Sequence, residues 1–149
     1  MAELLAAELS RHEVTLVDLA AERPDPSQFD YVVLGTSIRM NRPIRSVRRY
    51  IEKQEKALCT VPHTLFLCCA FPDQFEHYLG VAYTRALIDT AEECLYFGGD
   101  LTLSRQRGLD KLLTRMIRNS ILESEEEDAV LPTLLPEHVR TLADYLRKK

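Results

Sequence analysis

The chain has 149 residues, of which 46% are hydrophobic and 28% are charged, and its formal net charge at pH 7 is −4. These values are typical of an ordinary globular protein, and we expect one domain over residues 1–149, large enough for a proper core. The negative charge argues against bulk nucleic-acid binding. No apolar run approaches the roughly 18–20 residues that cross a membrane, and the N-terminus lacks the layout of a signal peptide. We therefore expect a cytoplasmic protein.

Four cysteines are present: Cys59, Cys68, Cys69 and Cys94. They form no C-x-x-C pair and no Cys/His cluster with zinc spacing, so we expect no metal site. Reduced thiols in a cytoplasmic protein are the simpler interpretation. Two of the thiols lie inside an apolar run, where cysteine usually packs as a small hydrophobic residue, and we favour that role over redox chemistry.

The first part of the chain alternates between helical and extended patterns. Residues 2–11 have nearly helical apolar spacing among strong helix formers. Residues 13–19, EVTLVDL, alternate and are rich in β-branched side chains, which predicts a strand. A loop over 23–30 leads into a continuous apolar strand over 30–38. Residues 43–58 then predict a helix with one apolar face.

The second part continues the alternation. Residues 63–71 predict another continuous apolar strand, and 77–93 predict a helix. Residues 94–103 predict a third apolar strand with a glycine pair inside it. Amphipathic patterns predict a helix over 108–122 and a closing helix over 136–149, and the acidic run ESEEED between them is typical of a solvated loop.

The order of these elements indicates the fold class. Continuous apolar strands that alternate with helices imply a parallel sheet covered on both faces, which is a doubly wound α/β fold. In such folds, ligands bind where the carboxyl ends of the strands open into loops, at the topological switch point.

The loop GTSIRMN, residues 35–41, follows one of these strands. Gly35 would let the backbone approach a flat ligand, Thr36 and Ser37 offer hydroxyls and amides, and Arg39 offers a fixed positive charge. The alternative is a plain strand-to-helix loop with an arginine that faces solvent.

The loop CCAFPDQFEHY, residues 68–78, follows the next strand. Phe71, Phe75 and Tyr78 could stack against a ring, and three polar side chains lie between them. The alternative is a set of core aromatics beside a surface loop. Neighbouring strand ends would make the two loops opposite walls of one site, which is stronger evidence than either loop alone.

The stretch DYVVLGTSIRMNRPIRSVRRYIEKQEKAL resembles the flavodoxin-like family, and most closely the flavodoxin-type, menaquinone-dependent protoporphyrinogen IX dehydrogenases and their flavodoxin-domain relatives. An aspartate or aspartyl-tyrosine, an apolar strand, G-[AT]-S-I-R and a helix recur together in that family. TLFLCCAF resembles the strand before the second flavin loop, YTRALIDT the helix that follows, and CLYFGGDLTL the fifth strand. The resemblance covers roughly residues 1–120, and G-T-S-I-R is its most specific element.

This resemblance implies an FMN-dependent oxidoreductase or electron-transfer protein. FMN would do the redox chemistry, and the protein would position the ring and tune its electronics. The residues implied on one side of the ring are Thr36, Ser37, Ile38, Arg39 and Asn41, and those on the other side are Cys69, Ala70 and Phe71.

The resemblance also implies a substrate and partners. A porphyrinogen, an intermediate of heme biosynthesis, bears carboxylates that a basic rim would hold, and Arg42, Arg45 and Arg49 have the spacing of one helical face. A solvated helix face is the alternative. A quinone would accept electrons, and the basic amphipathic helix expected over 108–122 would suit peripheral contact with the inner membrane face. Packing of that helix on the sheet is the alternative.

One departure from the family is visible. Flavodoxins bind the FMN phosphate in a Ser/Thr/Gly-rich loop between the first strand and the first helix. This sequence begins inside what matches that helix, so we expect a fold without the first strand, which is an interior one in the order 2-1-3-4-5. Residues 13–19 and 31–38 would then lack their shared neighbour. The explanations are a start assigned too late, which we favour, a partner chain or swapped element in the gap, or direct pairing of the two strands.

Three functions therefore stand as hypotheses. The first is the FMN-dependent oxidoreductase. The second is a cofactor-free flavodoxin-like module that acts through a protein partner or as a homodimer. A nicotinamide nucleotide binder is disfavoured, because no G-x-G-x-x-G follows a strand.

Overall fold

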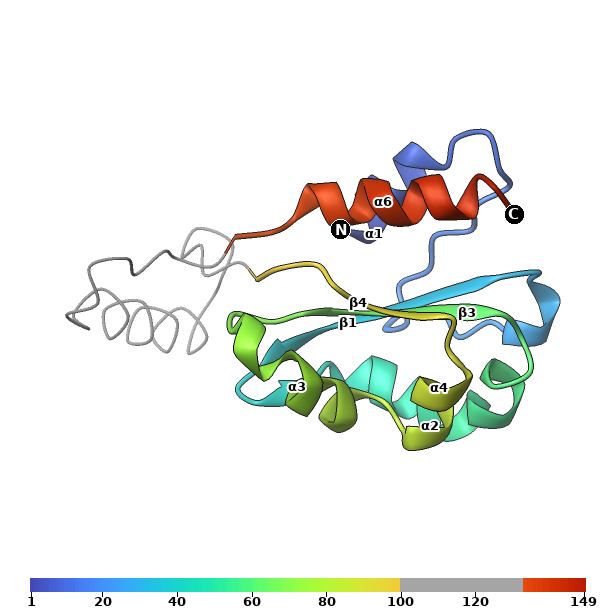
Figure 1. Cartoon of the computed structure of the whole chain (residues 1–149). Coiled ribbons are helices and arrows are strands. Elements are labelled where there is room, and N and C mark those ends of the chain that lie inside the picture. The colour runs from blue at the N-terminus through green and yellow to red at the C-terminus, as the bar shows by residue number, and fades with distance from the viewer. Residues whose placement is uncertain (100–132) are drawn as a thin grey trace.

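The protein is a three-layer α/β structure in which a sheet lies between two layers of helices (Figure 1). The computed structural model describes residues 1–99 and 133–149. The expected helix over 108–122 and the acidic run lie outside the described residues. None of the described helices is long and apolar enough to cross a membrane.

The described residues form a sheet of four strands in the order β2-β1-β3-β4. β1 (Val32–Arg39), β3 (His63–Cys68) and β4 (Glu93–Tyr96) are parallel, and β2 (Arg42–Pro43) is a short antiparallel return from the end of β1. All three parallel strands fall within expected apolar segments or one residue from them. The doubly wound α/β class is thereby confirmed.

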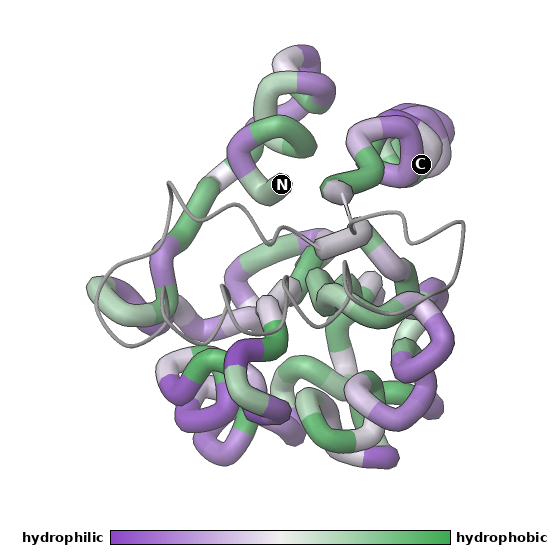
Figure 2. Tube along the Cα trace, turned by 90° about the vertical axis from the view of Figure 1, so that its left-hand side faces the viewer, coloured by the Kyte–Doolittle hydropathy of each residue, from purple (hydrophilic) through white to green (hydrophobic). Residues whose placement is uncertain are grey.

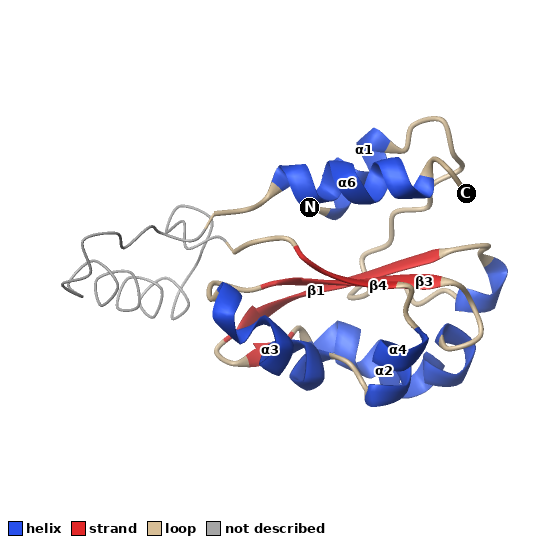
Figure 3. Cartoon of the chain, in the orientation of Figure 1, coloured by secondary structure: helices blue, strands red, loops and turns tan. Residues whose placement is uncertain are grey.

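One helical layer covers the lower face of the sheet (Figure 3). It consists of α2 (Arg45–Leu58), α3 (Phe75–Ala82) and α4 (Arg85–Thr90). The single helix expected over 77–93 is therefore wrong. The chain breaks at Tyr83 and Thr84, and the Thr84 side chain caps α4 by accepting from the Leu87 N–H at 3.4 Å.

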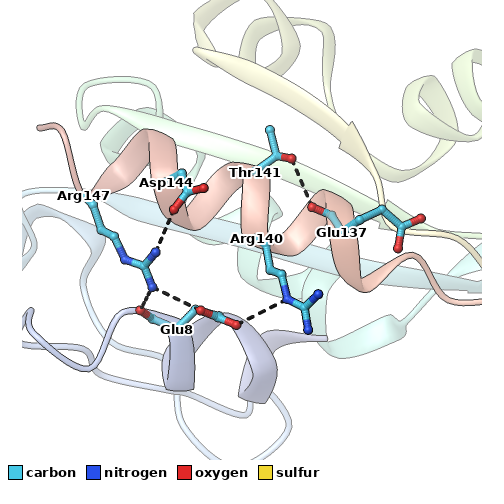
Figure 4. A network of polar contacts seen from close by, with 6 residues as sticks. All are labelled: Glu8, Glu137, Arg140, Thr141, Asp144 and Arg147. Carbon is cyan, nitrogen blue, oxygen red and sulfur yellow. Dashed lines mark hydrogen bonds and ion pairs between the residues drawn. The ribbon is translucent and has the colours of Figure 1, made fainter.

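The other face is covered by α1 (Ala2–Glu8) and α6 (Pro136–Leu146), which lie side by side (Figure 1). Glu8 joins the two helices: its carboxylate lies 3.6 Å from Arg140 and 3.1 Å from Arg147 (Figure 4). The Arg147 guanidinium also donates to the Glu8 carbonyl. Both chain ends are thus held on the same face.

β3 is the centre of the core, because its side chains belong to two apolar clusters on opposite faces of the sheet. Leu65 and Leu67 are fully buried in the lower cluster, against α2 and α3. Phe66 points into the upper cluster with Phe97 and the apolar sides of α1 and α6. Figure 2 shows hydrophilic residues along the outer sides of the helices, as this arrangement requires.

Residues 13–19 do not form the expected strand. Residues 13–18 have no regular structure, and direct pairing with β1 is not seen. Among the described residues, β1 is paired with β3 along its length and with the two-residue β2 at its end. A β-rich pattern alone does not make a strand, because a strand needs hydrogen bonds from a neighbour.

Candidate functional site

The two predicted loops adjoin each other, because the strands before them are hydrogen-bonded neighbours. β1 and β3 are parallel, with Thr36 opposite Leu67 and Ser37 opposite Cys68. The loop after β3 therefore starts beside the end of β1, at the carboxyl edge of the sheet. Open α/β sheets bind ligands at this edge. We call residues 35–41 and 69–74 the two-loop site.

The two hydroxyls at the end of β1 differ in their roles. Thr36 is 4% exposed, and its Oγ1 accepts a hydrogen bond from the Ile44 N–H at 3.2 Å, which ties the entry of α2 to β1. The Ser37 hydroxyl has no hydrogen-bond partner among the described residues, and this residue is only half-buried. Ser37, rather than Thr36, is therefore the hydroxyl available to a ligand.

A tight turn follows β1, with both central residues at positive φ: Met40 at +48° and Asn41 at +59°. Asparagine tolerates this conformation, but for other non-glycine residues it costs roughly 1 kcal/mol. The buried Tyr78 hydroxyl donates to Asn41 Oδ1 at 2.6 Å and so anchors the turn to α3. The turn presents Met40 to the surface, where it is 67% exposed.

Ile38 and Arg39, which the sequence placed in the first loop, are the last two residues of β1. Ile38 is half-buried and packs partly against the lower core cluster, so its side chain serves the core. Arg39 is exposed and lies opposite Arg42 in the β1–β2 pair. This places positive charge at the rim of the two-loop site.

The second loop begins with Cys69, Ala70 and Phe71, of which Cys69 is buried and the other two are half-buried. Cys69 Sγ donates to the Phe71 carbonyl at 3.4 Å, and the Tyr96 hydroxyl donates to the Cys69 carbonyl at 3.0 Å. A Cβ at Gly99 would lie 2.3 Å from that same carbonyl oxygen. The end of β4 therefore supports the backbone of the second loop closely.

The thiols at this strand end are held in the neutral form. Burial raises the pKa of Cys68 to about 11, and burial also raises the pKa of Cys69. All four cysteines are free thiols. Since the thiolate is the reactive form, these thiols act as apolar packing groups at neutral pH.

Two of the aromatic candidates are core residues, as the alternative interpretation held. Tyr78 is 4% exposed and bonded to Asn41, which leaves no free face for stacking. Phe75 packs against the lower core cluster, and its ring lies edge-on to Tyr96 with centroids 5.9 Å apart. Phe71 remains as the half-buried aromatic of the loop.

Packing inside the protein explains why residue 35 is a glycine. An added Cβ would lie 1.9 Å from Cζ of Phe66, whose ring covers this position and stacks on Phe97 at 4.6 Å. The structure therefore explains this glycine by packing within the upper layer. The sequence interpretation, which assigned it to the approach of a flat ligand, did not anticipate this.

Sequence reasoning missed Met40, Tyr96 and Gly99 as parts of the site. The sequence did carry a signal for the turn, since asparagine is typical of turn positions with positive φ. Asn41 lies between Arg39 and Arg42, which face each other across the β1–β2 pair. The contacts of Tyr96 and Gly99 with Cys69 join segments far apart in the sequence, so no local sequence pattern could predict them.

The three arginines of the expected basic row are exposed and have no ion-pair partner within the described part of the chain: Arg42, Arg45 and Arg49. The prediction that they share one helical face is wrong for Arg42, which lies on β2, whereas Arg45 and Arg49 lie on α2. Arg48, also on α2, pairs with Glu52 at 3.2 Å.

A family model described as "flavodoxin domain" matches residues 1–128. The chain belongs to this family. Comparisons with curated proteins and with solved structures gave no match.

Flavodoxin domains usually bind FMN, and the two-loop site offers suitable groups to the ring of that cofactor. The Ser37 hydroxyl, which has no partner among the described residues, and the half-buried Ala70 and Phe71 lie at adjoining strand ends.

Proposed function

We propose that this flavodoxin domain binds the isoalloxazine ring of FMN at the two-loop site and acts in electron transfer. The observation that carries the proposal is the parallel register of β1 and β3, which brings residues 36–37 beside 67–68. The family match supports the choice of cofactor.

The chain's own residues would bind and orient the ring. Ser37 Oγ supplies one free hydrogen-bonding group, and the Ala70–Phe71 backbone forms the opposite wall. Arg39 places a positive charge at the rim, where it favours an anionic ring edge. FMN, when bound, supplies reversible transfer of electrons. The neutral Cys68 and Cys69 keep this end of the sheet apolar.

A flavin titration tests the proposed ring site. Because the two-loop site would contact the isoalloxazine ring, which FMN and riboflavin share, we expect the fluorescence of both ligands to be quenched on binding. The measurement is a titration of each ligand followed by flavin fluorescence. Binding of neither ligand would overturn the proposed function.

A pair of serine variants tests the position of the ring. Ser37→Ala should weaken flavin binding by roughly 2- to 10-fold, the value of one hydrogen bond. Ser10→Ala is the matched control, since Ser10 is exposed beyond the end of α1. Equal affinities of both variants would contradict the placement of the ring at Ser37.

The finer proposal is oxidation of a carboxylate-bearing porphyrinogen, with electrons passed on to a quinone. Arg42, Arg45 and Arg49 would bind the substrate carboxylates, since guanidinium groups pair well with carboxylates. Appearance of porphyrin fluorescence in flavin-loaded protein is the assay. Replacement of these three by glutamine should raise KM, whereas Arg48→Gln should not, because Arg48 is already paired with Glu52. An equal change of KM in both variants would contradict the assignment of Arg42, Arg45 and Arg49 to substrate binding.

The alternative function is a cofactor-free module that acts through protein contacts. The observation that favours it is that no described segment pairs with the outer edge of β1 before β2. Colourless purified protein with no thermal shift on addition of FMN would support this alternative.

A further inference from the structure

A second cluster of charged and aromatic side chains lies at the edge of the sheet where the parallel strands begin. Tyr31 directly precedes β1, Glu92 directly precedes β4, and Tyr145 is in the last turn of α6, which runs toward this edge (Figure 1). The Glu92 carboxylate accepts hydrogen bonds from the Tyr31 hydroxyl at 2.9 Å and from the Tyr145 hydroxyl at 3.0 Å. We call Tyr31, Glu92 and Tyr145 the amino-edge cage. The two-loop site lies at the opposite edge of the sheet.

Hydrogen bonds to the sheet orient this cage. An ionised carboxylate can only accept hydrogen bonds, so the single proton of the Tyr31 hydroxyl points to Glu92. The Tyr31 oxygen then accepts from the Thr64 hydroxyl at 2.7 Å, and Thr64 is fully buried in β3. The hydrogen bonds from Thr64 through Tyr31 to Glu92 therefore position one ring and the carboxylate, and no cation is needed for this.

An ammonium group occupies the cage. The Nζ atom of Lys149 lies 4.6 Å from the centroid of the Tyr31 ring and 5.4 Å from the centroid of the Tyr145 ring. The same atom lies 2.5 Å from Glu92 Oε1. Both ring distances are within the roughly 6 Å over which an aromatic face attracts a cation. The hydrogen bond to Glu92 raises the pKa of the Lys149 amine above its ordinary value of 10.5, so the amine is charged at neutral pH.

The cage differs from the ordinary surface ion pairs of this protein. Arg48–Glu52 and Arg85–Asp89 each join two residues four apart on one helix. The amino-edge cage instead brings two aromatic faces and one carboxylate to a single ammonium from three separate parts of the chain. Aromatic faces arranged around a cation recognise ammonium ligands in other proteins, and a carboxylate adds charge-assisted hydrogen bonds.

We propose that the amino-edge cage is a binding site for a primary alkylammonium group, and that Lys149 is its occupant from within the chain. The Lys149 side chain is 39% exposed and Tyr145 is 38% exposed, so the site opens to solvent. An external amine therefore binds by displacing Lys149. A primary amine fits better than a quaternary one, because the short distance to Glu92 requires N–H donors and leaves no space for N-methyl groups.

Removal of the internal occupant tests the site. The measurement is a titration of the full chain with n-butylammonium, in which the NMR signals of Tyr31 and Thr64 give the Kd. An occupant that fills the cage about nine-tenths of the time raises the apparent Kd of an external ligand about tenfold, so Lys149→Ala should bind the probe at least about tenfold more tightly than the wild type. Lys148→Ala is the control and should bind like the wild type, because Lys148 is exposed and forms no ion pair with any described residue.

Two further measurements test the chemistry of the cage. The uncharged analogue n-butanol should not bind to Lys149→Ala, and in the wild type the two rings should shift the ε-methylene proton signals of Lys149 upfield relative to those of Lys148. The proposal is overturned by a Lys149→Ala protein that does not bind n-butylammonium, by equal Kd values for Lys149→Ala and Lys148→Ala, by equal binding of n-butanol, or by the absence of the upfield shift. None of these readouts involves flavin, so they are independent of the proposed function.

Discussion

The Tyr78 hydroxyl donates to Asn41 Oδ1 over 2.6 Å and thereby joins the turn after β1 to the helix that follows β3. The bond thus fixes the exposed Asn41 of the two-loop site to the buried Tyr78 of α3. The bond holds a turn whose two central residues are at positive φ. A strained turn kept in place by its surroundings is a recurrent feature of functional sites.

Tyr78→Phe should lower the free energy of unfolding by about 1 kcal/mol and should also weaken flavin binding, because the turn loses its anchor. Tyr50→Phe is the matched control, since its hydroxyl donates to the Pro24 carbonyl at 2.8 Å, outside the two-loop site. Denaturant unfolding and flavin titration measure the two effects. Flavin affinities reduced equally in both variants would contradict a specific role of the Tyr78 bond.

The adjacency of the two loops could be predicted from the sequence, because it follows from the order of two apolar strands. β1 and β3 are recognisable as continuous apolar runs, and consecutive parallel strands are commonly neighbours. The failure at residues 13–19 has an equally simple cause. Their pattern is local, whereas a strand requires a hydrogen-bonded neighbour, and no described segment pairs with these residues.

Contacts between distant elements account for the other differences. α3 ends at Tyr83, whose backbone is extended (φ −124°, ψ 152°). Its single hydroxyl proton lies between the Phe66 carbonyl, at 2.7 Å, and the Leu34 carbonyl, at 3.1 Å, inside the sheet. Thr84 then starts α4. The apolar periodicity over 77–93 continues through this break, so it could not reveal two helices.

Two glycine variants test the packing of the upper layer. Gly35→Ala should lower the free energy of unfolding by roughly 1–3 kcal/mol, because its Cβ would lie 1.9 Å from the Phe66 ring, which is itself stacked on Phe97. Gly80→Ala, inside α3 with nothing within 4 Å of the new Cβ, should be neutral or stabilising by up to about 1 kcal/mol. Urea unfolding of both proteins is the measurement.

A double variant identifies the cause. Adding Phe66→Leu to Gly35→Ala should recover part of the stability that Gly35→Ala loses, since the smaller side chain makes room for the methyl group. Additive losses in the double variant would show that the ring of Phe66 is not the obstacle.

The thiol of Cys68 should be unreactive at ordinary pH. Because burial raises its pKa to about 11, only about one part in a thousand is thiolate at pH 8. The rate of alkylation in the native protein, followed by mass spectrometry of the peptide, should therefore keep rising up to about pH 11. A rate that already levels off near pH 9 would contradict an environment that disfavours the thiolate.

Glu92 should make stability depend on pH in the acidic range. Its carboxylate accepts hydrogen bonds from Lys149, Tyr31 and Tyr145, which brings the C-terminus to the start of β1. The Lys149 ammonium is the main reason that the pKa of Glu92 lies below its ordinary value of 4.5. A carboxyl group with a lowered pKa stabilises the fold above its unfolded pKa, and this stabilisation disappears as the pH falls through the folded pKa.

Glu92→Gln should therefore be less stable than the wild type at neutral pH, and the difference should shrink as the pH falls below 4.5. Thermal unfolding over a pH series measures it. Glu93→Gln is the control, because Glu93 is exposed and forms no ion pair with any described residue. A Glu92→Gln difference that stays constant down to low pH would mean that the lost stability does not come from the charge of the Glu92 carboxylate.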